Sequence, residues 1–308
     1  MLIASWYREG TMNLDESLLS HRFTERNGVR LHYVEAGEGP LVVLLHGFPE
    51  LWYSWRHQIP ALVQAGFRVI APDMRGYNLS DKPEGVAAYA IDELTADVAA
   101  LIRVAGDTRS ARAAAVVGHD WGAGVAWAFA ARHPELYDRL VVLNGPHPAR
   151  LIASFRTARQ LRKSWYMFFF QLPKVPELLA QRNDYEMFRA VLKDDPRRPG
   201  AVTDEELARY VEAWSRPGAL TATINYYRAA FRPASLLGSG KLPRIEAPVL
   251  VIWGEHDRYL GAELAAPDPA AVPNARVARV PDAGHPVHYD RPERVNQLLL
   301  EFLRENRA

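Results

Sequence analysis

The sequence contains no cysteine among its 308 residues. Disulfide bonds, thiol nucleophiles and cysteine ligands for metals are therefore excluded, while the redox compartment stays open. An excess of charge of one sign is also missing, since 37 Lys and Arg face 36 Asp and Glu for a formal net charge of +1. A chain with so weak an overall field has no general attraction for nucleic acid or anionic lipid. We expect neither as a partner.

Long hydrophobic runs are absent as well. No segment approaches the roughly 18 uninterrupted apolar residues of a membrane helix, and polar residues follow the first three residues, MLI, too soon for a signal peptide. We therefore expect a cytoplasmic protein that does not span a membrane. With 48% hydrophobic residues, the chain can bury a large core as one α/β domain or as a domain with an insertion.

Short apolar runs rich in β-branched residues recur along the chain, with helical stretches between them. They are LVVLL at 41–45, FRVIA at 67–71, AAAVV at 113–117, RLVVL at 139–143 and VLVIW at 249–253. Such runs are typical of parallel strands that are buried on both faces. Apolar residues at helical spacing predict a crossover helix over Ile91–Ala105, which Gly106 ends. The pattern predicts an α/β fold.

The remaining segments complete the predicted organisation. The Asn27-Gly28 dipeptide predicts a hairpin, and a last strand at 275–280 precedes a helix near 291–305. Between Gly145 and about Arg244 the strand pattern gives way to aromatic, basic and proline-interrupted helical segments. We predict an α/β core formed by residues 1–144 and 245–308, with an inserted helical cap at 145–244.

The segment AAAVVGHDWGAGVAWAFAARHP predicts a strand, a sharp turn and a helix. Gly118, Asp120 and Gly122 give the G-x-nucleophile-x-G pattern, in which small flanking residues permit a strained turn that exposes the central side chain. An aspartate stands where many hydrolases have serine. The pattern alone is weak, because an Asp at this position could simply cap the following helix.

Two further residues strengthen the functional interpretation. Asp257 follows the buried strand VLVIW, and His285 lies in the turn after the predicted final strand. Alone, Asp257 could be a turn residue and His285 a surface histidine. Their order along the chain, nucleophile then acid then histidine, is that of a catalytic triad on this type of fold.

The loop after the first buried strand contains His46, Gly47, Phe48 and Pro49. Such a loop supplies one backbone N–H of an oxyanion hole, and the residue after the nucleophile supplies the other, which predicts Phe48 and Trp121. For His46 we favour a structural hydrogen bond within the loop. The other histidines, His119, His256 and the His285/His288 pair, do not follow a metal-binding pattern on one helix. We therefore predict neither a metal nor a cofactor.

The motifs HGFP at 46–49, DMRGYNLSDKP at 73–83 and GHDWGA at 118–123, with the Asp257 and His285 loops, resemble the epoxide hydrolases of the α/β-hydrolase superfamily over about residues 25–305. RGYNLSDKP and HDWGAG look especially similar to bacterial members. The resemblance implies a mostly parallel eight-stranded sheet flanked by helices, with an inserted helical cap. It also implies Asp120 as nucleophile, His285 as the base of a second step and Asp257 as its orienting acid.

The resemblance further implies two cap tyrosines that hold the epoxide oxygen. Tyr166, in SWYMFFFQLP, matches the first, and Tyr227, directly before Arg228, matches the second. Tyr226 is the alternative one residue away, and ordinary aromatic packing is the simpler interpretation of any of them. We expect the substrate pocket to be lined by the cap residues Trp165, Phe168, Phe169, Phe170 and Met187.

The expected reaction is the hydrolysis of an apolar epoxide by water to a vicinal diol, through a covalent ester on Asp120. One alternative is a haloalkane or haloacid dehalogenase, which uses the same ester and for which Trp121 could bind halide. Against it, Phe48 replaces the asparagine of many haloalkane dehalogenases, and Trp121 replaces the arginine of fluoroacetate dehalogenases. Another alternative is a non-enzymatic ligand-binding receptor, which would have a broken triad or lack a tyrosine. The sequence does not predict the oligomeric state.

Overall fold

The computed structural model describes residues 7–8, 11–12, 14–106, 112–232 and 242–305. Its centre is an eight-stranded sheet with the strand order β10-β9-β8-β7-β5-β6-β4-β3. Strand β4 pairs antiparallel with β3 and β6, and the other neighbours are parallel. The strands are β3 (Ser20–Arg26), β4 (Val29–Ala36), β5 (Leu41–Leu45), β6 (Arg68–Pro72), β7 (Ala115–His119), β8 (Leu140–Leu143), β9 (Val249–Gly254) and β10 (Ala275–Val280), with a separate short hairpin of β1 (Tyr7–Arg8) and β2 (Thr11–Met12).

The predicted fold class is confirmed, because each apolar run forms a strand of this mostly parallel sheet. The ends differ slightly: β7 begins at Ala115, two residues later than predicted, and Ala113 makes only an isolated bridge to Tyr137. The predicted hairpin joins β3 to β4. Its two turn residues, Asn27 and Gly28, both have positive φ, of 50° and 75°, as a tight type I′ turn requires.

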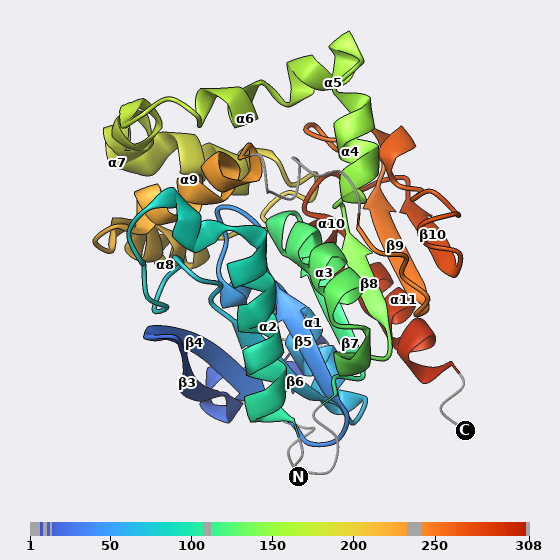
Figure 1. The fold of residues 1–308 in the computed structure, drawn as a ribbon. Coiled ribbons are helices and arrows are strands. Elements are labelled where there is room, and N and C mark those ends of the chain that lie inside the picture. Colours follow the sequence, from blue (N-terminus) through green and yellow to red (C-terminus); the bar gives the residue numbers. More distant parts are fainter. Residues whose placement is uncertain (1–6, 9–10, 13, 107–111, 233–241, 306–308) are drawn as a thin grey trace.

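Helices cover both faces of the sheet. Figure 1 shows α2 and α3 in front of the sheet and α1 and α11 behind it. Alternate residues of a strand serve the two layers, so that Val43 packs with the α2–α3 side and Val42 with the α1–α11 side. This two-sided burial explains why the strands are apolar at every position. The core helices are α1 (Gln58–Gln64), α2 (Ile91–Ala105), α3 (Trp121–Arg132), α10 (Val287–Asp290) and α11 (Pro292–Arg304), and the short 3-10 helices are η2 (Glu16–Leu18), η3 (Trp52–Trp55), η4 (Val86–Tyr89), η5 (Pro134–Leu136) and η6 (Ala262–Leu264).

A helical insertion between β8 and β9 forms the cap, and its helices lie within the predicted 145–244 segment. Figure 1 shows these helices across the top of the sheet. Helix α7 is interrupted by non-helical backbone at Arg182–Tyr185. The cap helices are α4 (Pro148–Ser154), α5 (Ala158–Lys163), α6 (Trp165–Phe169), α7 (Val175–Asp194), α8 (Asp204–Ser215) and α9 (Ala219–Ala230).

Directed contacts fix the cap to the core. The indole Nε1 of Trp214 donates to the carbonyl oxygen of Pro49 at 2.7 Å, and buried Arg56 donates to the carbonyl oxygen of Ala201 at 2.6 Å. The Arg56 guanidinium also pairs with Glu206. The cap is therefore attached next to the loop that contains Phe48. Among the described residues, no helix is long and apolar enough to cross a membrane.

Candidate active site

Asp120 occupies a strained turn between β7 and α3, with φ 50° and ψ −116°. Neighbouring glycines make this turn possible. A Cβ atom on Gly118 would lie 2.3 Å from the carbonyl oxygen of Gly122, and one on Gly122 would lie 2.1 Å from that of Leu45. The Asp120 side chain makes no capping hydrogen bond to α3. The turn therefore presents the carboxylate instead of using it as a helix cap.

The two carboxylate oxygens of Asp120 have different neighbours. Oδ1 accepts a hydrogen bond from the backbone N–H of Phe48 at 2.8 Å. Oδ2 lies 3.4 Å from Nε2 of His285. Trp121 is the first residue of α3, so its backbone N–H belongs to the unpaired start of that helix. Phe48 and Trp121, the two residues predicted to form an oxyanion hole, thus both lie beside Asp120.

Asp257 holds His285 in place from the other side. Oδ2 of Asp257 lies 2.7 Å from Nδ1 of His285 and accepts from the side-chain amide of Asn144 at 2.8 Å. Its Oδ1 accepts the backbone N–H groups of Tyr259 and Leu260, at 2.8 and 2.9 Å. Burial opposes the charge on Asp257, yet the neighbouring His285 and these hydrogen bonds lower its pKa below the ordinary value. Asp257 is therefore an anion at neutral pH.

His285 lies between two carboxylates. Burial opposes its protonation, but the charge of Asp257 and the hydrogen bond to Asp120 outweigh burial and raise the pKa of His285 well above 6.5. His285 therefore holds its proton more strongly than an ordinary histidine, beside the ionised Asp257 carboxylate. The ionised Asp257 carboxylate stabilises the protonated form of His285.

Two further buried residues, Glu50 and His119, contact the Phe48 loop and His285, a role that the sequence did not indicate. Buried Glu50 accepts the backbone N–H of Gly47 at 2.9 Å and lies 3.2 Å from Nδ1 of His119. Nε2 of His119 lies 3.1 Å from the carbonyl oxygen of His285. Burial opposes ionisation of Glu50, but His119 and the other partners lower its pKa. Glu50, His119 and His285 are far apart in the sequence, so no local pattern predicted these contacts between them.

Glu50, His119 and His288 also place possible metal-ligand atoms within 4.8 Å of one another. The facing atoms of Glu50 and His119 are already in hydrogen bonds, and the His288 ring packs against Trp55 with centroids 4.9 Å apart. These three residues are therefore better suited to holding the neighbouring loops in place than to binding a metal ion. His46 bonds locally as expected, with Nδ1 2.9 Å from the carbonyl oxygen of Gly47, and Nε2 also accepts the backbone N–H of Met74.

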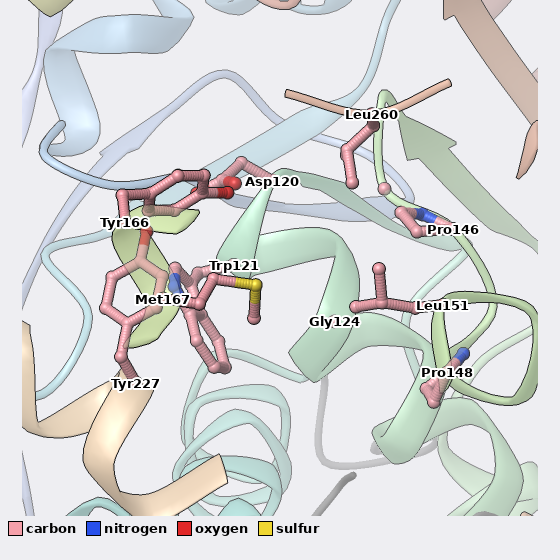
Figure 2. Close-up of a pocket in the computed structure, with 11 residues that line it drawn as sticks. Asp120, Trp121, Gly124, Pro146, Pro148, Leu151, Tyr166, Met167, Tyr227 and Leu260 are labelled. Atoms are coloured by element: carbon pink, nitrogen blue, oxygen red, sulfur yellow. The ribbon is translucent and has the colours of Figure 1, made fainter. Parts of the chain in front are cut away.

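The cap contributes two tyrosines to the space above Asp120. Figure 2 shows Tyr166 from α6 and Tyr227 from α9 beside Asp120. Their ring centroids are 5.8 Å apart. Burial and then the charge of Asp120 raise the pKa of both phenols well above 10, so both remain protonated donors. Tyr226 is directed elsewhere, because its hydroxyl donates to the carbonyl oxygen of Arg75 at 2.7 Å.

Two cavities meet at Asp120. The larger has a volume of about 220 Å³, and the smaller, drawn in Figure 2, of about 60 Å³. Both are bordered by Tyr166 and Tyr227. The larger is bounded by four of the predicted pocket residues, Trp165, Phe169, Phe170 and Met187, and by three that the sequence did not indicate, Phe188, Val191 and Tyr259.

The prediction for Phe168 is wrong, since this residue lines neither cavity at Asp120. It is 46% exposed and packs against Phe155 and Phe231. Helical geometry explains the error. Successive residues of a helix point about 100° apart, so one short aromatic run cannot direct every ring to the same side.

Comparisons with known proteins identify the family. A family model of the alpha/beta hydrolase fold matches residues 40–292. The chain is 45% identical over 289 residues to the AB hydrolase superfamily protein YfhM of Bacillus subtilis, covering 92% of this chain and 97% of that protein. It is 34% identical over 319 residues to Epoxide hydrolase 2 of Caenorhabditis elegans, covering 98% and 87%.

Solved structures give the same result. The chain is similar to the crystal structure of an epoxide hydrolase from Bacillus megaterium in complex with an inhibitor, with a TM-score of 0.82 and 34% identity over 92% of this chain and 100% of that one. A mutant of an epoxide hydrolase from the same organism, with a TM-score of 0.81, 34% identity and the same coverage, was crystallised with its product, a naphthyloxy propanediol. The chain thus belongs to the α/β-hydrolase fold family and is closely related to its epoxide hydrolases.

Proposed function

We propose that this protein is an epoxide hydrolase that converts an apolar epoxide to a vicinal diol through a covalent ester on Asp120. The main support is the position of Asp120. Its carboxylate lies at the strained turn after β7, near the phenols of Tyr166 and Tyr227 and near His285. The relationship to epoxide hydrolases supports the same reaction.

The first step follows from the arrangement around Asp120. Because an epoxide carbon is sp³, a carboxylate can open the ring by displacement while an acid stabilises the departing oxygen. A new bond forms between Asp120 and carbon, the carbon–oxygen bond of the ring breaks, and the developing alkoxide takes a proton from Tyr166 or Tyr227. A phenol with a raised pKa still donates this proton, because an alkoxide is a much stronger base than a phenolate.

Ester formation also prepares His285 for the second step. The ester is neutral, so the charge of Asp120 that helps to hold the proton on His285 disappears. The pKa of His285 then falls, and its proton returns through solvent to the phenolate. The resting pair of Asp120 carboxylate and His285 imidazolium thus becomes a neutral ester beside a neutral imidazole. His285 acquires its function as a base when the ester is ready for hydrolysis.

In the second step, His285 removes a proton from water, and the oxygen of that water attacks the ester carbonyl. Asp257 stabilises the imidazolium that forms, and the amides of Phe48 and Trp121 stabilise the oxyanion. The tetrahedral intermediate then collapses and expels the diol as an alkoxide. The alkoxide takes the proton of the carboxyl group that forms on Asp120. Asp120 carboxylate and His285 imidazolium are regenerated.

The cavity suggests the kind of epoxide. Its aromatic boundary, which includes Trp165, Phe169 and Phe170, suits an aryl or bulky alkyl group that gains by leaving water. A naphthyloxy diol is the product crystallised with the Bacillus megaterium mutant. We therefore expect turnover of aryl epoxides such as styrene oxide or phenyl glycidyl ether.

A single turnover in ¹⁸O-labelled water tests the covalent route. With enzyme in excess over phenyl glycidyl ether, the label should enter the Asp120 peptide, while the first diol formed contains unlabelled oxygen from the protein. Mass spectrometry of the peptide and of the diol measures both. Label that passes directly into the first diol would show attack by water on the epoxide and would refute the ester.

The dehalogenase alternative is tested in the same assay. The Trp121 ring packs edge-on against the Tyr227 ring, with centroids 5.0 Å apart, so its side chain already has a partner in the proposed epoxide site. Styrene oxide and 1-bromobutane should be assayed side by side, and we expect diol from the first and no bromide from the second. A ligand that binds in the cavity without turnover of either compound would instead support the receptor alternative.

A further inference from the structure

The outer surface of the cap exposes an unusual number of large apolar side chains. Among the described residues, the exposed large hydrophobics outside the cap are Phe23 and Val104. All the others belong to the cap: Leu161, Trp165, Phe168, Leu172, Val175, Leu178, Leu179 and Phe231. Figure 1 shows α5, α6 and α7 along one edge of the molecule, with no other element above them. We call this surface the outer cap face.

Exposed apolar residues recur on α6 and on the first turns of α7, two of the helices that Figure 1 shows along this edge. On and just after α6, Trp165, Phe168 and Leu172 recur at intervals of three and four. Val175, Leu178 and Leu179 are exposed at the start of α7, a separate helix that follows a turn at 170–174. Met167, on another side of α6, is apolar and buried. A helix that is apolar all round is normally buried on every side, which leaves one side of α6 without its expected cover.

The helices that carry these apolar residues, and the turns beside them, also contain exposed basic residues. Arg156, Arg159, Arg162, Lys174 and Arg182 are exposed, and in the part of the chain that the structure describes none of them forms an ion pair. The one acid in residues 151–182, Glu177, is already paired with Arg228 at 2.6 Å. The face is therefore both apolar and cationic.

We propose that the outer cap face docks onto the surface of an anionic lipid bilayer. Aromatic and aliphatic side chains surrounded by Arg and Lys are the combination that inserts at the headgroup level of such a membrane. A second copy of the chain is a poorer occupant. A symmetric dimer through this face would bring the same unpaired cations toward one another.

Docking in this orientation also concerns the active-site cavity. Trp165 is 61% exposed on the outer cap face and at the same time lines the larger cavity. The cavity therefore opens at, or close to, the docked surface. If the proposed function holds, an apolar epoxide dissolved in the bilayer reaches Asp120 without crossing water. The docking itself does not depend on that reaction.

Vesicle co-sedimentation of the full-length protein tests the proposal without any turnover. We expect binding to phosphatidylcholine vesicles that contain 30% phosphatidylglycerol, and little binding to phosphatidylcholine alone. One variant combines Arg159→Glu with Arg162→Glu. It should lower partitioning by about 25-fold or more, since each basic side chain near an anionic surface contributes about fivefold. A second variant, Leu172→Asp with Leu178→Asp, should lower partitioning on the order of tenfold by removing apolar contact.

The matched control combines Arg103→Glu with Val104→Asp, an exposed basic and apolar pair at the end of α2, far from the cap in Figure 1. The control should bind vesicles like the unmodified protein. Equal binding by all variants, or no binding to anionic vesicles, would overturn the proposal. A dimer would also overturn it, if light scattering detects the dimer in the unmodified protein but not in the Leu172/Leu178 variant and vesicle binding is absent. Circular dichroism verifies that each variant is folded.

Discussion

The backbone N–H of Phe48 donates to Oδ1 of Asp120 at 2.8 Å, although 72 positions separate the two residues in the chain. This hydrogen bond orients the carboxylate before any substrate binds. In the proposed reaction, Oδ1 is held at the oxyanion hole, and Oδ2, which lies 3.4 Å from Nε2 of His285, is the attacking oxygen. After esterification Oδ1 becomes the carbonyl oxygen, already bound where negative charge develops in the second step.

Replacing His285 should block the second step and spare the first. In His285→Gln the carboxylate of Asp120 and both tyrosines remain, so the ring can open, but nothing activates the water. Mixing this variant with phenyl glycidyl ether should increase its intact mass by one epoxide. Continued diol release at the normal rate with no adduct would show that His285 is not the base.

The charge of Asp120 should control the protonation of His285. Asp120→Asn imitates the neutral ester, because it removes the negative charge and nearly preserves the shape. We expect a lower pKa for His285 in this variant than in the unmodified protein, since a contribution that raises the pKa is lost. Nitrogen NMR of histidine-labelled protein across pH, with the signal assigned through His285→Gln, measures the change. An unchanged pKa would contradict the proposed switch of His285.

Asp195 gives the stability of the fold a pH dependence of defined sign. It follows α7 and is 5% exposed, and its Oδ1 has no hydrogen-bond partner among the described residues. Burial raises its pKa to about 6, although His285 acts in the opposite direction. Between the ordinary value of 3.8 and 6, the folded protein keeps a proton that the unfolded chain has released. The free energy of unfolding therefore falls as pH rises through this window, by about 3 kcal/mol at most.

Asp195→Asn removes this cost of ionisation. The variant should be more stable than the unmodified protein at pH 7.5, and the advantage should shrink toward pH 4.5, where the carboxyl is protonated anyway. Urea unfolding at the two pH values measures the difference. Asp194→Asn, at the adjacent exposed position, is the matched control and should change neither value. An equal loss of stability at both pH values would instead indicate that the Asp195 charge is stabilised, with Arg258 at 3.8 Å as the candidate partner.

Local patterns were sufficient for the strands and for Asp120. A strand such as 41–45 must be apolar throughout because both of its faces are covered, and the turn at Asp120 needs glycines that are visible in the sequence. What could not be predicted depends on helix rotation or on contacts between distant segments. Glu50 acts through His119, which no local pattern reveals, and Phe168 differs from Phe169 only by one step around a helix.

The net charge of the whole chain also gave no sign of the exposed basic residues on the cap. A net charge of +1 gave no reason to expect a membrane surface as a partner. The basic residues of 151–182 share that stretch of sequence with one acid, the paired Glu177, and acids elsewhere in the chain balance them only in the sum. Since screening limits electrostatic attraction to about 10 Å, it is the charge of one face that matters for docking.

The two cap tyrosines should both donate to the epoxide oxygen during ring opening. Tyr166 and Tyr227 come from different helices, 61 residues apart in sequence, and both border the two cavities at Asp120. Both phenols are protonated at neutral pH, so each can donate to the epoxide oxygen. Each single Tyr→Phe change should slow ring opening by about 10- to 1000-fold, the range for losing one positioned donor, and the double change should abolish it. Rapid-quench measurement of ester formation isolates this step.

Tyr226→Phe is the matched control, because it removes the same hydroxyl from the adjacent position. That hydroxyl donates to the carbonyl oxygen of Arg75 and is directed away from the cavities at Asp120, so its loss should lower stability by about 1 kcal/mol and leave ring opening nearly unchanged. Phe keeps the aromatic volume in every variant, so folding is retained. A nearly normal rate in Tyr227→Phe with a large loss in Tyr226→Phe would assign the donor to Tyr226. If both hydroxyls were needed only for packing, the three single variants would lose stability alike and open the epoxide at similar rates.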